Sequence, residues 1–148
     1  MMYIIQFLAA FIAVVAWSIN LEIPKKYLTI SGLVGAIGWI TYLVSMYFNL
    51  PEIFSYFLSA LVVTILSLIL SKILNAVSTI FLIPGILPIV PGIAMYKMIY
   101  SLINNNNADA IHYLLQAIFI AVGIALAIFI TECIKGIKII RKEQINEN

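Results

Sequence analysis

Long apolar intervals, separated by single charged residues or short charged groups, dominate the chain. Five intervals contain no Asp, Glu, Lys or Arg, and each has at least 19 residues: 1–21, 27–51, 53–71, 73–96 and 110–131. A helix that spans a bilayer needs about 20 apolar residues. Helices are expected rather than strands, because lipid offers no partner to an open strand edge. The pattern predicts an all-α, polytopic helix bundle that forms a single integral membrane domain over residues 1–148. Its spans are expected near 2–20, 28–48, 52–71, 78–103 and 111–134, followed by a short cytoplasmic tail, 135–148.

Composition narrows the class of protein further. Hydrophobic residues make up 64% of the chain and charged residues 9%, whereas a soluble domain carries roughly 25% charged residues. This balance excludes a soluble globular domain, a disordered chain and a nucleic-acid binder with a basic face. The chain has one cysteine, Cys133, and one histidine, His112. We therefore expect no disulfide framework, no metal site and no cofactor. Few polar residues are available to build a catalytic cleft, and we do not expect an enzyme.

The basic residues predict the orientation in the membrane. With five spans, three groups of basic residues fall on one side of the bilayer. They are Lys25 and Lys26, then Lys72, and finally Lys135, Lys138, Arg141 and Lys142. Basic loops face the cytoplasm. We therefore expect a multi-pass protein of the plasma membrane with its N-terminus outside and its C-terminus in the cytoplasm.

Small and hydroxylated residues mark two faces for helix packing. In the second span, Gly32, Gly35 and Gly38 lie near Ser31 and Ala36 at spacings that let helix backbones approach closely. In the third span, Ser55 and Ser59 begin a row of serines that continues with Ser67 and Ser71. Helix contact through these residues is the simpler interpretation. The alternatives are a sliding face in the second span and a water-filled path along the third.

The fourth span contains three prolines and two glycines within ten residues: Pro84, Gly85, Pro88, Pro91 and Gly92. Proline lacks an N–H group and clashes with the carbonyl group four residues earlier. We expect two half-helices, 78–83 and 91–103, joined by irregular backbone deep in the membrane. The second half-helix would direct free N–H groups, beginning with that of Gly92, toward the membrane centre, where they would attract an anion. Discontinuous helices of this kind form substrate sites in secondary transporters. A kinked helix with only a packing role is the alternative.

Four polar side chains near the ends of the spans have two interpretations each. His112, at the start of the fifth span beside Asp109, marks the outer interface or takes part in a proton relay. Lys97 extends to the outer interface or neutralises an anionic substrate. Tyr96 belongs to an interfacial aromatic belt or, one turn after Gly92, to the site. Glu132 pairs with Lys135 on the helix surface or carries a coupling proton.

The segment Pro88-Ile-Val-Pro91-Gly92-Ile-Ala-Met-Tyr96 resembles the P-x-x-P-G-x-x-x-Y stretch of the threonine/serine exporter family. Ile23-Pro24-Lys25-Lys26 and the glycines that follow are similar to the family's second-helix pattern. The resemblance covers roughly residues 20–103 and fits the small-subunit type, in which a short membrane protein works with a separate, larger membrane subunit. It implies proton-driven export of small carboxylates, either threonine- and serine-type amino acids or dicarboxylates such as succinate. It places Pro88, Pro91, Gly92 and Tyr96 on the motif, whereas Lys97 lies outside it.

Together these observations predict one half of a two-component exporter, with Pro84, Gly85, Pro88, Pro91, Gly92, Tyr96 and Lys97 along the transport path. A structural or assembly subunit without substrate contact is the main alternative. A channel would need several copies of the chain, since one copy offers no ring of charges, so a homo-oligomer stays open. An intramembrane enzyme finds little support, because no acidic pair lies at depth.

Overall fold

Helices form all of the regular structure in the part of the chain that the computed structural model describes, residues 2–146, with side chains described for residues 3–136. They are α1 (Met2–Asn20), α2 (Lys25–Tyr47), α3 (Glu52–Ile73), α4 (Thr79–Ile86), the 3-10 turn η1 (Leu87–Ile89), α5 (Gly92–Ile103) and α6 (Asn107–Asn146). Four helices are long and apolar enough to cross a membrane, and the bent pair of Thr79–Ile89 and Gly92–Ile103 makes a fifth span if it is counted as one. The prediction of an all-α membrane bundle with a broken fourth span is confirmed.

The last helix is longer than the expected fifth span. We expected helix near 111–134, whereas α6 begins at Asn107 and continues to Asn146, through most of the stretch assigned to the tail. The side chains of Lys138, Arg141 and Lys142, which contributed to the orientation, lie outside the described side chains.

Tight turns bring neighbouring helices side by side. Glu22, Asn49 and Asn105 each adopt a positive φ directly after a helix. At each position the N–H group of the next residue donates to the carbonyl five residues back, as from Leu50 to Ser45 at 3.3 Å. This is the Schellman ending, which satisfies carbonyls that a helix end leaves free. Pro24 and Pro51 then precede the following helices, so each chain reversal takes only a few residues.

The asparagine run between α5 and α6 builds one such turn. The Asn104 side chain donates to the Tyr100 carbonyl oxygen at 2.9 Å. The Asn106 amide caps α6, accepting from the Asp109 N–H at 3.3 Å and donating to the Asp109 carboxylate at 2.7 Å. The bond from the Asp109 N–H group is the N-cap half of a capping box, and the second bond joins the two side chains. The run is therefore explained by a helix ending and a helix start.

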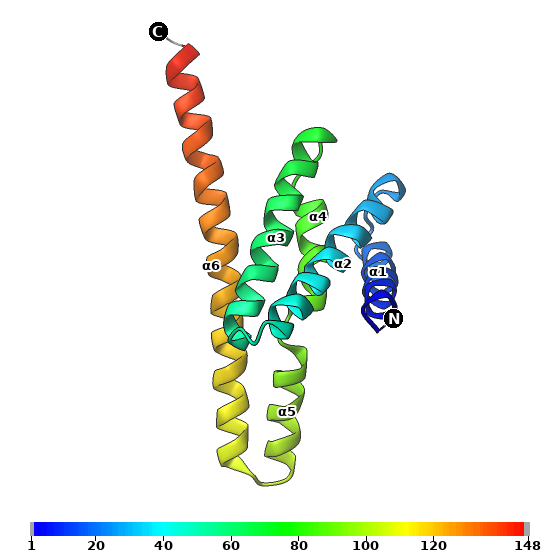
Figure 1. Ribbon diagram of the computed structural model, residues 1–148, viewed down its shortest axis with the longest axis vertical. Helices are drawn as coiled ribbons and strands as arrows, with labels where there is room; N and C mark the ends of the chain where they lie inside the picture. The colour runs from blue at the N-terminus through cyan, green and yellow to red at the C-terminus, as the bar shows by residue number, and fades with distance from the viewer. Residues whose placement is uncertain (1, 147–148) are drawn as a thin grey trace.

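The helices form a bundle with a projecting hairpin (Figure 1). The bundle consists of α1 to α4 and the C-terminal part of α6, around a core that includes Val34, Ala60, Val63, Ile89 and Ile124. The hairpin consists of α5 and the first turns of α6, and extends past the connection between α2 and α3. Within residues 2–146, α5 packs against α6 and against no other helix. Its position relative to the bundle therefore depends on the α4–α5 connection and on α6.

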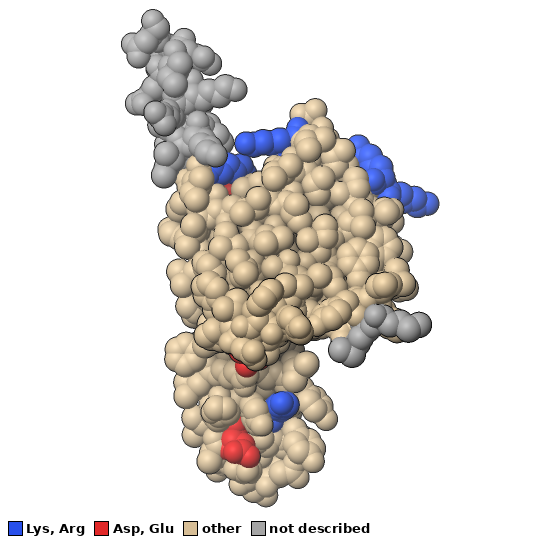
Figure 2. All heavy atoms as spheres, in the orientation of Figure 1, with Lys and Arg blue, Asp and Glu red and all other residues tan. Residues whose placement is uncertain are grey.

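Basic side chains gather at one end of the molecule (Figure 2). Lys25 begins α2 and Lys72 lies in the last turn of α3, which places them at the end where Lys72 and Lys135 line a common surface pocket. At the opposite end, Figure 2 shows one basic group close to acidic groups.

Candidate functional site

The break in the fourth span lies at Val90 and Pro91. The axes on its two sides differ by 46°. Val90 is extended, with φ −57° and ψ 138°, and Pro91 has φ −73° and ψ 51°. The Gly92 N–H group donates to the Val90 carbonyl oxygen at 2.7 Å across Pro91, which is the pattern of an inverse γ-turn. The expectation of a free N–H group at Gly92 is therefore wrong, because this short turn supplies its partner.

Pro84 does not end the first half-helix. We expected that half-helix over 78–83, whereas α4 runs through Pro84 to Ile86 and η1 continues to Ile89. Pro84 removes the N–H partner of the Ile80 carbonyl, but the Ser31 hydroxyl donates to that oxygen at 3.2 Å. The Pro84 carbonyl accepts from the Leu87 N–H group. A side chain from α2 thus replaces the missing backbone bond, and the helix continues.

Gly85 and Gly38 allow α4 and η1 to pack closely on α2 and α3. A Cβ atom at Gly85 would lie 2.9 Å from Val34 and 3.0 Å from Val63. A Cβ atom at Gly38 would overlap Val63 and lie 3.2 Å from Ile89. The first half of the broken span is therefore held inside the bundle on this side.

The other expected packing residues also lie at helix contacts. A Cβ atom at Gly32 would meet Val15 at 2.5 Å, and one at Gly35 would meet Val14 at 2.6 Å, so both glycines face α1. The Ser59 hydroxyl donates to the Gly38 carbonyl at 2.6 Å. The Ser55 hydroxyl donates within its own turn to the Pro51 carbonyl at 3.2 Å. Throughout the described side chains, every buried nitrogen and oxygen atom has a hydrogen-bond partner.

The residues expected along the transport path do not all meet. Pro84, Gly85 and Pro91 are buried, and Pro88 lies at a shallow surface pocket with Gln6 and Trp39. Gly92 is exposed, and a Cβ atom there would meet nothing within 4 Å. Tyr96 is 68% exposed and stacks on Tyr100 with ring centroids 6.3 Å apart. The structure thus brings Gly92 and Tyr96 to an open surface.

A small polar pocket is lined by side chains of α2, α3, α5 and α6. Its volume is about 90 Å³, and its lining residues are Tyr42, Glu52, Tyr56, Ile93, Ala94, Lys97, Gln116 and Ile120. We call it the polar pocket. The Gln116 amide donates to Glu52 Oε2 at 2.7 Å. Lys97 Nζ lies 5.4 Å from the centroid of the Tyr113 ring, close enough for a cation–π contact. The pocket holds an acid, a base and an amide next to the first turn of α5.

The polar pocket places the break near one end of α3 rather than beside its middle. Ile93 and Ala94 follow the break directly, and both line the pocket with Glu52, the first residue of α3. Figure 1 shows the α4–α5 connection level with the α2–α3 connection. The structure thus places the break near the end of α3 that begins at Glu52, and the position of this irregular backbone deep in the membrane stays a prediction.

Glu52 and Gln116 were missed as site residues from the sequence. In the sequence, Glu52 follows Pro51 and is typical of a loop residue. Its position at the polar pocket depends on the packing of α6 against α3. Gln116 did carry a signal, because a single amide within the apolar interval 110–131 is costly unless it has a partner.

Two other polar groups expected near the ends of the spans lie apart from the polar pocket. Lys135 Nζ and Glu132 Oε2 are 3.3 Å apart on the surface of α6, so the predicted ion pair is confirmed. The His112 side chain is exposed, with its ring 5.5 Å from that of Tyr113. Within the described part of the chain, no three His, Cys, Asp or Glu side chains come together to hold a metal ion.

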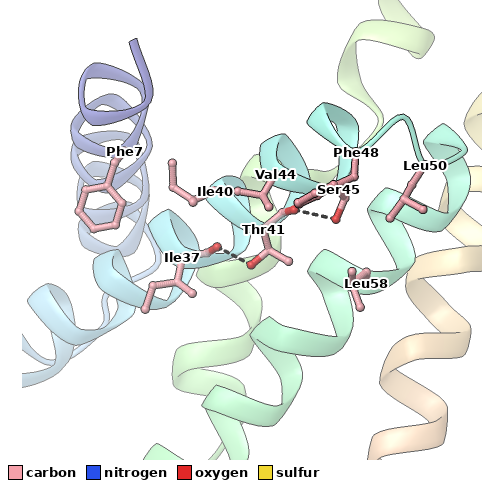
Figure 3. A pocket seen from close by; sticks show the side chains of 9 residues that line it. All are labelled: Phe7, Ile37, Ile40, Thr41, Val44, Ser45, Phe48, Leu50 and Leu58. Atoms are coloured by element: carbon pink, nitrogen blue, oxygen red, sulfur yellow. Dashed lines mark hydrogen bonds between the residues drawn. The ribbon is translucent and has the colours of Figure 1, made fainter. Parts of the chain in front are cut away.

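A larger apolar pocket lies on α2 between α1 and α3 (Figure 3). Its volume is about 460 Å³. The hydroxyl groups of Thr41 and Ser45 turn away into their own helix, donating to the Ile37 and Thr41 carbonyls at 2.9 and 2.8 Å. The pocket therefore presents hydrocarbon and suits an acyl chain or an apolar side chain rather than a polar substrate.

Comparison with known proteins gives one family and one relative. The model of the family described as "Threonine/Serine exporter, ThrE" matches residues 6–134. A protein from Haemophilus influenzae (strain ATCC 51907 / DSM 11121 / KW20 / Rd), described as "Uncharacterized protein", is 28% identical over 96 residues. The aligned stretch covers 65% of this chain and 32% of that relative, so the chain spans about a third of the relative's length. No solved structure matches the chain.

Proposed function

Because this chain belongs to the threonine/serine exporter family, we propose that it is one subunit of a secondary transporter that exports small carboxylates. The proposed substrates are threonine- and serine-type amino acids or dicarboxylates such as succinate. The family is one of transporters rather than of enzymes. The apolar helices and the family together make the chain a multi-pass membrane protein.

The observation that carries this proposal is the break between α4 and α5. Helix α4 has eight residues and η1 has three, which gives about 18 Å of helix between the α3–α4 connection and the break. Because Ile93 and Ala94 share a pocket with Glu52 at the far end of α3, we place the break in the outer part of a hydrocarbon layer about 30 Å thick. Non-helical backbone is tolerated at that depth only inside protein or beside water. We assign Pro84, Gly85, Pro88, Pro91, Gly92, Tyr96 and Lys97 to the transport path on this basis.

The open surface beside Gly92 is the part of this path available to a substrate or to a second subunit. Pro84, Gly85 and Pro91 are buried, and Gly85 packs against Val34 of α2 and Val63 of α3. Tyr96 lies one turn beyond Gly92 on α5 and is exposed.

The distribution of charge supports an orientation in the plasma membrane. The basic ends of α2 and α3 and the Lys135 region of α6 lie at one end of the molecule (Figure 2). The positive-inside rule makes that end cytoplasmic. The N-terminus and the α5–α6 turn then face outward.

Two observations support a larger partner subunit. About two thirds of the Haemophilus influenzae relative lies outside the aligned stretch, which is the arrangement expected if both parts are fused there. The hairpin also exposes apolar side chains, such as Ile99, Ile103 and Leu114, beyond the end of the bundle. A lipid layer that covers the 22 residues of α3, about 33 Å of helix, leaves the far end of α5 uncovered. Contact with a partner would remove this apolar surface from water.

Efflux from loaded cells that contain both subunits tests the transport path. Gly92→Leu is expected to abolish efflux, because the new side chain extends into the open space beside the break, where its Cβ atom meets nothing within 4 Å. Gly136→Leu is the matched control, since a Cβ atom there also meets nothing within 4 Å and the residue lies on α6 at the basic end. Unchanged efflux in Gly92→Leu, with normal amounts of protein in the membrane, would remove the break from the path.

A structural or assembly subunit is the second candidate, favoured by the exposed apolar hairpin. It predicts that substitutions at Gly92 and Tyr96 reduce co-purification of the partner, while substrate affinity in the surviving complex stays unchanged. A homo-oligomer would appear in the same purification as copies of this chain bearing two different tags.

A further inference from the structure

We propose that the polar pocket binds the charged head of a small zwitterionic amino acid, with the ammonium group on Glu52 and the carboxylate on Lys97. This inference rests on the proposed export function and deepens it. It favours amino acids over dicarboxylates, because a second carboxylate would lie against Glu52.

The charges of the pocket are opposite but are not paired with each other. Glu52 and Lys97 line one cavity, but they do not form an ion pair with each other. Among the described side chains, the ion pair within 4 Å joins Lys135 and Glu132. Lys97 contacts the Tyr113 ring instead. A molecule that carries an ammonium group and a carboxylate a short distance apart could pair with Glu52 and Lys97 at the same time. Charge-assisted hydrogen bonds of this kind are about twice as strong as neutral ones.

One oxygen of the Glu52 carboxylate is available to a ligand in the polar pocket. Gln116 donates to one oxygen of the Glu52 carboxylate, which orients that group and leaves its other oxygen without a hydrogen bond in the described structure. The remaining acid at this end, Asp109, is held by the Asn106 amide at 2.7 Å. Glu52 is therefore the acidic group in position for an ammonium ion.

The size of the cavity limits the ligand. A volume of about 90 Å³ corresponds to about three water molecules at roughly 30 Å³ each. The head of an amino acid with a short side chain suits such a space, whereas a large aromatic side chain does not.

The pocket is connected mechanically to the break. Lys97 lies on α5 and Glu52 on α3, and in the described part of the chain α5 packs against α6 but not against α1 to α4. A change of angle at Val90 and Pro91 would alter the separation of the two charges. A ligand that bridges Glu52 and Lys97 would therefore favour one position of α5. Occupancy of the polar pocket is in this way linked to the conformation of the broken span.

Binding to the complete two-subunit complex in lipid nanodiscs tests the proposal, with labelled L-serine and labelled succinate as probes. Glu52→Gln is expected to weaken L-serine binding at least tenfold and to leave succinate binding unchanged or stronger. Lys97→Met is expected to weaken both. Glu132→Gln, at the other end of the molecule, is the matched control and should change neither. Unchanged L-serine affinity in Glu52→Gln would overturn the assignment.

A second measurement does not depend on the stability of those variants. In a Cys133→Ser background, Ile93→Cys introduces a thiol at the polar pocket while keeping Glu52 and Lys97, and Asn105→Cys introduces one at the exposed α5–α6 turn. L-serine is expected to slow labelling by a membrane-impermeant thiol reagent at position 93 at least fivefold and to leave position 105 unaffected. Equal rates with and without L-serine would overturn the proposal.

Failure of the proposed function and failure of the pocket assignment give different results. If the unmodified complex exports neither class of substrate, the proposed function itself fails. If the complex exports a substrate but these tests fail, only the pocket assignment fails.

Discussion

The Ser31 hydroxyl donates a hydrogen bond to the Ile80 carbonyl oxygen, 3.2 Å away, and this is the carbonyl that Pro84 leaves without a backbone partner. The two residues of the bond lie 49 positions apart in the chain. A polar side chain on α2 therefore satisfies the carbonyl group at the point where α4 continues through its proline.

A double-mutant cycle between Ser31 and Pro84 measures this compensation. Ser31→Ala is expected to lower the free energy of unfolding by about 1–2 kcal/mol, because a buried carbonyl loses its donor. In a Pro84→Ala background the same change should cost clearly less, since the alanine N–H group can pair with Ile80. The measurement is reversible unfolding in mixed micelles. Thr41→Ala is the control, because its hydroxyl bonds to its own helix on a partly exposed face. Additive effects of the two substitutions would contradict the interpretation.

Gly38→Ala should destabilise the bundle by about 1–3 kcal/mol, the usual cost of overfilling a packed core. The added Cβ atom would overlap Val63 and press on Ile89, and the Ser59 bond to the Gly38 carbonyl would be displaced. Gly136→Ala adds the same methyl group where nothing lies within 4 Å. Thermal unfolding of the two variants in one detergent should therefore differ, and equal midpoints would argue against tight packing at Gly38.

Asn106→Ala should weaken the start of α6 by about 1 kcal/mol, the typical value of a lost N-cap. The substitution removes both bonds to Asp109. Hydrogen exchange at the amides of the first turn of α6 is the measurement, and faster exchange confined to that turn is expected. Asn104→Ala removes a side-chain bond to the end of α5 instead, so faster exchange at α6 in that variant would indicate a general loosening of the hairpin.

The proposed orientation predicts opposite accessibility for two thiols. Cys133 is exposed near the basic end, so a membrane-impermeant thiol reagent should label it only after the cells are permeabilised. Asn105→Cys in a Cys133→Ser background should react in intact cells. The reverse result would place the basic end outside and contradict the positive-inside assignment.

The local sequence predicts that the fourth span is broken but not where the break lies. Three prolines in one apolar stretch predict an interruption, and the structure contains it. The sequence does not say which proline produces it. Pro84 is tolerated because Ser31 supplies a donor, whereas Val90 and Pro91 leave helical geometry and close the turn on Gly92. The choice depends on a neighbouring helix and not on the prolines themselves.

The polar pocket depends even more on distant contacts. Its Glu52–Gln116 bond joins residues 64 positions apart. Glu52 resembles any acid beside a turn, and only the packing of α6 on α3 gives it an amide partner. Tyr96 shows the opposite case, because a motif position next to the break is turned to the exposed side of α5.

The amino-acid sequence alone was enough to predict an all-α membrane protein, the existence of a broken span and the gathering of basic residues at one end. These features follow from hydropathy, proline chemistry and the cost of moving charge into lipid, all of which act within a single segment. The tertiary structure decided the place of the break, the projection of the hairpin and the meeting of Glu52, Lys97 and Gln116 at one pocket. Those features depend on which helices pack together, and in a chain this apolar many pairings satisfy hydropathy equally well, so shape and a few polar bonds choose among them.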